Sequence, residues 1–124
     1  MSTTPTQEQL DAIFPPSRTE AFFDALFGGA EEGAYDIRLR FVKADNTSAL
    51  LHFALLQRPG KCLACNLTYG LPQVFARHPV LDVKGVAAAV AELLGWEPAS
   101  TRWELGHTEE HSREEHAIPL RLHR

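Results

Sequence analysis

The sequence has few of the residues that mark secreted, membrane or nucleic-acid-binding proteins. Only two cysteines occur among 124 residues, too few for a disulfide framework, so we expect a reducing, cytoplasmic compartment. No apolar run approaches the roughly 20 residues that cross a bilayer, and no Lys or Arg precedes Arg18 as a signal peptide would require. Twelve basic against sixteen acidic residues give a formal net charge of -4, with no basic stretch to offset a phosphate backbone. We therefore expect no membrane segment and no nucleic-acid partner.

The composition is that of one soluble globular domain. Hydrophobic residues make up 44% and charged residues 23% of the chain. A chain of 124 residues buries enough surface to form a core without disulfide bonds or a structural metal. We expect a single domain over residues 1–124, with a short N-terminal helix and a Pro-Pro break in 1–16 and the main body in 17–124.

Apolar residues at helical spacing indicate two N-terminal helices and one central helix. Each stretch follows a residue that can cap free amide hydrogens at a helix start, namely Thr6, Ser17 and Asp82. Residues that end helices follow each stretch, at Pro15-Pro16, Gly28-Gly29 and Gly95. A short helical turn is also expected over residues 73–77.

Strict alternation of apolar and polar residues predicts an antiparallel sheet. The expected strands are 35–43, 48–57, 61–69, 102–107 and 117–123. The first three form a meander, and Pro119 predicts that the last strand lies at a sheet edge. The predicted fold class is α+β: a three-stranded antiparallel meander plus two C-terminal strands, with the N-terminal helices and the central helix packed on the sheet.

The first hairpin predicts a register that places polar residues side by side. A three-residue loop at 45–47 sets Arg40 opposite His52, whereas a two-residue loop would pair the core residue Phe41 with His52. The same argument in the next hairpin sets His52 against Asn66. The outer face then carries a candidate ligand-binding site made of Arg38, Arg40, His52 and Asn66. The alternative is that a helix or a second subunit covers the row, whose polar groups then satisfy one another.

Cys62 and Cys65 form a C-x-x-C motif, which in redox enzymes brings two sulfur atoms together at a helix N-terminus. Here the motif falls in the expected strand 61–69, whose alternation places Cys62 on the outer face and Cys65 in the core. We expect these thiols to form neither a disulfide nor a shared metal site. A Cys62–Cys65 disulfide detected by mass spectrometry in the folded protein would contradict the strand.

The segment from His107 to His111 matches the H-x-x-E-H pattern of a class of zinc hydrolases. That chemistry needs both histidines on one helix face, but this segment follows an expected strand and lacks apolar anchors. A looser candidate metal site is made of His107, His111 and His116, because imidazole favours zinc, nickel or copper. The alternative is a charged loop that faces water. We expect no catalytic constellation and no cofactor.

In size, acidic balance and order of elements, residues 17–124 resemble the small dimeric chaperones of bacterial type III secretion. In those proteins a helix, three strands, a second helix and two more strands precede a final helix, whereas this chain ends in the strand-like residues 119–123. No functional residue is carried over. The resemblance implies a homodimer that binds an extended segment of a partner protein on exposed apolar surface.

The leading hypothesis is therefore a small cytoplasmic binding or chaperone-like protein that acts as a homodimer and is not an enzyme. The alternative is a metal-binding or small-molecule-binding enzyme that uses the outer sheet face or the His-rich loop 107–116.

Overall fold

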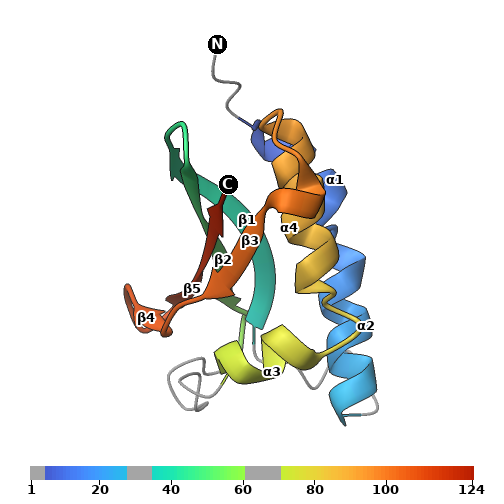
Figure 1. Cartoon of the computed structure of the whole chain (residues 1–124). Helices are drawn as coiled ribbons and strands as arrows, with labels where there is room; N and C mark the ends of the chain where they lie inside the picture. Colours follow the sequence, from blue (N-terminus) through green and yellow to red (C-terminus); the bar gives the residue numbers. More distant parts are fainter. Residues whose placement is uncertain (1–4, 28–34, 61–70) are drawn as a thin grey trace.

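The computed structural model is an antiparallel sheet with its long helices on one face (Figure 1), which confirms the predicted α+β class. It describes residues 5–27, 35–60 and 71–124. The helices are α1 (Gln7–Ile13), α2 (Pro16–Phe27), α3 (Leu71–Arg77), α4 (Val83–Leu93) and the 3-10 helix η3 (Pro98–Ser100). The strands are β1 (Tyr35–Ala44), β2 (Ser48–Gln57), β3 (Arg102–Leu105), β4 (Glu109–Glu110) and β5 (Glu115–His123). No helix within these described ranges has both the length and the apolar character to span a membrane.

The sheet order is β1-β2-β5-β3, and the short strand β4 pairs with β5 alongside β3. The C-terminal strand β5 therefore lies beside β2, in the position expected for residues 61–69. Those residues, with Cys62, Cys65 and Asn66, lie outside the described residues, so the expectations about them stay predictions.

The predicted register of the first hairpin is confirmed from Tyr35 to Phe41, but a β-bulge between Phe41 and Lys43 shifts it by one residue, so Lys43 lies opposite Leu50. Leu39 lies opposite Phe53 and Arg40 lies opposite His52. The Asp45 N–H donates to the Ser48 carbonyl, so the turn encloses two residues rather than the expected three, and the Asp45 carboxylate accepts hydrogen bonds from the backbone N–H groups of Thr47 and Ser48. These bonds favour the charged form, which lowers the pKa of Asp45.

Pro119 does not lie in an edge strand, so this prediction was wrong. It sits in the middle of β5, which has β2 on one side and β3 and β4 on the other. The Pro119 carbonyl accepts a hydrogen bond from the Gly106 N–H, so the ring nitrogen faces the interruption between β3 and β4. A missing donor costs little at this point, because the neighbouring edge strand is broken there.

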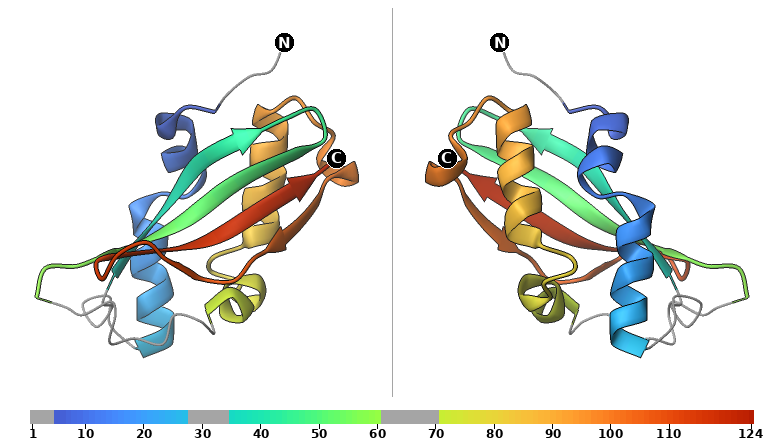
Figure 2. Two further views of the ribbon diagram at one scale, coloured as in Figure 1. Left: turned by 90° about the vertical axis from the view of Figure 1, so that its left-hand side faces the viewer. Right: turned by 90° about the vertical axis from the view of Figure 1, so that its right-hand side faces the viewer.

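The buried apolar residues form one core cluster with members from both the sheet and the helices. Figure 2 shows the helices on one face of the sheet. Phe53 in the central strand β2 is fully buried, and its ring meets the rings of Phe14 and Phe75 edge-on, with centroids 5.5 and 5.7 Å apart. Phe22 and Phe23, part of the apolar stripe expected after Ser17, are buried as well. Helix α4 adds Val86, Ala87, Val90 and Ala91 from one face.

Side chains from the N-terminal helices cover the free edge of β1. The Thr19 hydroxyl accepts from the Ile37 N–H and donates to the Ile37 carbonyl, both at 3.3 Å. The Gln7 side-chain amide donates to the Leu39 carbonyl at 2.8 Å. Backbone groups on this edge that would otherwise be open to another strand are therefore already bonded within the chain.

Replacing Phe53 tests this core. We expect Phe53→Ala to lower the free energy of unfolding by about 3 to 5 kcal/mol, because it opens a cavity between β2, α1 and α3. Denaturant unfolding measures the change. Val42→Ala is the matched control, since Val42 is 45% exposed and its truncation should shift stability by less than about 0.5 kcal/mol. A loss below about 1 kcal/mol for Phe53→Ala would show that Phe53 is not in the core.

Candidate functional site

The outer face is the face of the sheet turned away from α1, α2 and α4 (Figure 1). Alternation along β2 directs His52 and Ala54 to this face, while Phe53 points to the helices. Across the neighbouring strands, His52 has Arg40 on one side and Pro119 on the other. Pro119 thus occupies the position in this row that was expected for Asn66.

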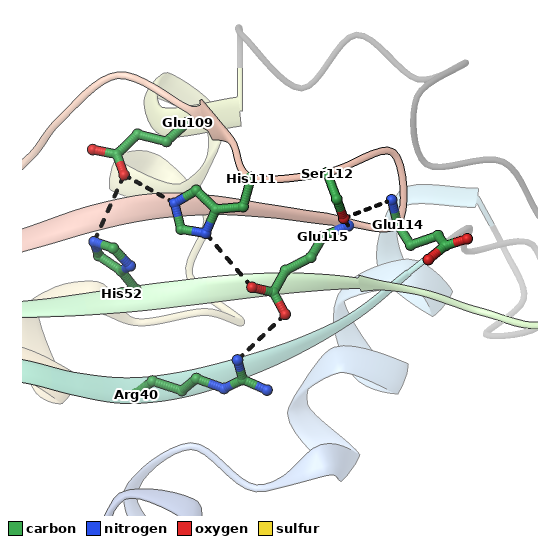
Figure 3. A network of polar contacts seen from close by, with 7 residues as sticks. All are labelled: Arg40, His52, Glu109, His111, Ser112, Glu114 and Glu115. Atoms are coloured by element: carbon green, nitrogen blue, oxygen red, sulfur yellow. Dashed lines mark hydrogen bonds and ion pairs between the residues drawn. The ribbon is translucent and has the colours of Figure 1, made fainter.

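The turn between β4 and β5 brings further polar groups onto the outer face beside His52 (Figure 3). A Glu109 carboxylate oxygen lies 3.1 Å from His111 Nε2 and 3.9 Å from His52 Nε2. One ligand atom from each of the three residues lies within 4.8 Å of those of the other two. We call His52, Glu109 and His111 the His-Glu cluster.

A second arm of contacts leads from the cluster to β1. His111 Nδ1 lies 3.5 Å from Glu115 Oε2, and Arg40 Nη1 donates to Glu115 Oε1 at 3.3 Å (Figure 3). Arg40 and His52, which the sequence paired across two strands, are therefore joined to the hairpin loop through carboxylates. The arrangement links β1, β2 and the β4–β5 turn.

The electrostatics at His52 favour its neutral form. Partial burial in the central strand lowers the pKa of His52, and the nearby His111 lowers it further. Glu109 and Glu115 act in the opposite direction, because negative charge stabilises the imidazolium. Desolvation is the largest of these effects, so the net pKa shift is downward. A neutral imidazole is the form that can bind a metal ion.

The remaining candidate residues lie apart from the cluster. Arg38 forms an ion pair with Asp11 of α1 at 3.0 Å, which also lowers the pKa of that carboxyl. His107 is exposed in the connection between β3 and β4. His116 lies opposite Leu55, on the helix-facing side of the sheet, and is 2% exposed. The three histidines proposed as metal ligands therefore do not converge, and only His111 belongs to the cluster.

Two carboxylates, Glu109 and Glu115, organise this site; the sequence indicates them as possible cation ligands of loop 107–116, but not their position beside His52. Their presence in a His- and Glu-rich loop was visible, but nothing in the local pattern indicated that this loop folds against His52. Only the pairing of β5 with β2 places it there.

Comparison of the chain with models of known protein families, with curated proteins and with solved structures finds no match. The resemblance to type III secretion chaperones stays a prediction.

The pKa of His52 gives a direct test of the site. NMR titration of its ring protons should show a pKa below the ordinary value of about 6.5. An unfolded chain then binds more protons than the folded chain near this pH, so the contribution of His52 to stability falls as the pH drops through this range. Glu109→Gln should lower the pKa further, since it removes a negative charge. A His52 pKa at or above about 6.5 in the wild type would contradict the partly buried position.

Proposed function

We propose that this protein is a small cytoplasmic, non-enzymatic binding or chaperone-like protein that acts as a homodimer through the outer face of its sheet. The observation that carries the proposal is the placement of two basic and two acidic side chains toward opposite ends of that face. Lys43 and Arg121 flank Leu50 at the end near the β1–β2 hairpin. Glu109 and Glu115 lie at the other end, near the β4–β5 turn.

A second copy of the chain fits this distribution. A twofold axis that lies between two facing sheets and runs perpendicular to their strands reverses the strand direction. Each basic end then meets the acidic end of the partner, and opposite charges at an interface favour that alignment over others. The partner would also cover two partly exposed apolar side chains, Leu50 at the basic end and Leu56, which lies opposite Glu115 at the acidic end.

The face is a better interface than the edge of β1. Thr19 and Gln7 already bond the backbone groups of Ile37 and Leu39 there, so a second chain cannot add a strand without displacing them. On the outer face, by contrast, none of the described helices covers the sheet (Figure 2).

Charge reversal at the basic end tests the homodimer. Sedimentation over a range of concentrations should show a wild-type dimer, and Lys43→Glu combined with Arg121→Glu should weaken association at least tenfold. Lys84→Glu is the control, because Lys84 is an exposed residue of α4 on the other side of the sheet. The control should leave the dimer unchanged.

Mixing complementary variants makes the test specific to the proposed alignment. A chain with Glu109→Lys and Glu115→Lys should also dissociate, but should form a heterodimer with the Lys43→Glu, Arg121→Glu chain, because both pairs of facing ends again have opposite charge. A wild type that stays monomeric at high concentration would overturn the proposal, and so would a dimer insensitive to both sets of changes.

A further inference from the structure

We propose that His52, Glu109 and His111 form a binding site for one divalent transition-metal ion of the zinc class. The inference goes beyond the proposed dimer, since all three ligands come from one chain and the site needs no second copy. It also differs from the histidine set expected from sequence, because it combines one residue of the outer-face row with two of the His-rich loop.

The separation of the ligand atoms fits a metal ion. Zinc binds imidazole nitrogen and carboxylate oxygen at about 2.0 to 2.2 Å, so two ligands of a tetrahedral ion lie roughly 3.4 Å apart. Glu109 Oε1 is 3.1 Å from His111 Nε2 and 3.9 Å from His52 Nε2, which brackets that value. The Glu109 and His111 side chains are 47% and 38% exposed, so small rotations can complete the geometry.

The backbone holds the three ligands on one platform. His52 is fixed in the central strand β2, and Glu109 lies in β4 opposite Ala117 of β5. The turn that carries His111 is closed by hydrogen bonds from the His111 N–H to the Glu115 carbonyl and from the Glu115 N–H to the Ser112 hydroxyl. The ligands therefore come from a hairpin with a defined shape, and little chain ordering is needed when the ion binds.

Residues around the ligand His111 support the proposed metal site independently of the distances between ligand atoms. Histidines that bind metals usually donate their other ring N–H to a carboxylate, which fixes the tautomer and the ring orientation. Glu115 faces His111 Nδ1 at 3.5 Å and is itself held by Arg40. A proton on Nδ1 leaves the Nε2 lone pair directed toward Glu109, where the ion would lie. Glu115 and Arg40 thus act as positioning residues.

The ligand set selects the kind of ion. Two imidazoles and one carboxylate suit zinc, nickel or copper, whereas magnesium and calcium require mostly oxygen ligands. Three protein ligands leave at least one coordination position for water or for an external group. The partly exposed cluster leaves that position open to solvent.

Calorimetry with Zn²⁺ on the untagged full-length protein tests the site. We expect one ion per chain, no comparable binding of Mg²⁺, and at least a tenfold loss of Zn²⁺ affinity in His52→Ala, Glu109→Gln and His111→Ala. His107→Ala and His123→Ala are matched controls, because these exposed histidines lie outside the cluster. Cobalt should give the visible absorption of a low-coordinate site in the wild type, and this absorption should be lost in the cluster variants.

Two results would overturn the site: no Zn²⁺ binding by the folded wild type, or affinity that falls in the controls as much as in the cluster variants. Circular dichroism establishes that each variant is folded. If His52→Ala does not fold, Glu109→Gln and His111→Ala decide, since both side chains are largely outside the core.

The positioning role of Glu115 and Arg40 can be tested separately. Glu115→Ala should weaken Zn²⁺ binding by roughly 10- to 100-fold, the range typical of lost outer-shell partners. It should also shift the pH dependence of binding, because the Nδ1 proton of His111 loses its acceptor, whereas a purely structural effect would weaken binding equally at all pH values. Arg40→Lys should retain most of the affinity, as it keeps a cation beside Glu115. An unchanged pH profile in Glu115→Ala would contradict the positioning role.

Discussion

The pairing of β2 with β5 is the interaction on which the rest of the structure depends. It joins residues 48–56 to residues 115–123 in a continuous antiparallel ladder and puts both strands at the centre of the sheet. On the helix side this ladder aligns Phe53 with Ile118, at the middle of the core. On the outer side it carries the β4–β5 turn to His52, so the same pairing builds the core and the candidate site.

Much of the fold follows from local sequence. The capping box at Thr6 and Gln9, the Asp82 cap and the register that places Arg40 opposite His52 all rest on contacts between residues close together in the chain. The position of β5 beside β2 does not follow from local sequence. A strand that returns from the far end of the chain competes for the same edge of β2 as any nearer strand, and local alternation cannot decide between them.

The wrong edge position predicted for β5 and the failure to predict the His-Glu cluster have one cause, which Pro119 illustrates. A proline in a strand predicts an edge, because it cannot donate to a neighbour. Here the neighbouring strand is interrupted at Gly106. A Cβ atom at this position would lie only 3.3 Å from Pro119 Cγ, so the absence of a side chain leaves room for the proline ring. When β5 is assigned to an edge, nothing places His111 and Glu109 beside His52. The outer-face row and the His-rich loop 107–116 are then predicted as two separate candidate sites.

The outer face thereby combines two properties that need not exclude each other. Lys43 and Arg121 at one end and Glu109 and Glu115 at the other suit the proposed twofold partner. The end that carries Glu109 also holds two imidazoles and a carboxylate within reach of one ion. Both depend on the β4–β5 turn lying over β2.

The most direct test of the account is NMR measurement of short interproton distances across β2. The structure predicts contacts between the backbones of Phe53 and Ile118 and between the rings of His52 and His111, whose centroids are 5.6 Å apart. Contacts that place residues 61–69 beside β2 on that edge, without those to β5, would contradict the sheet order and the site built on it.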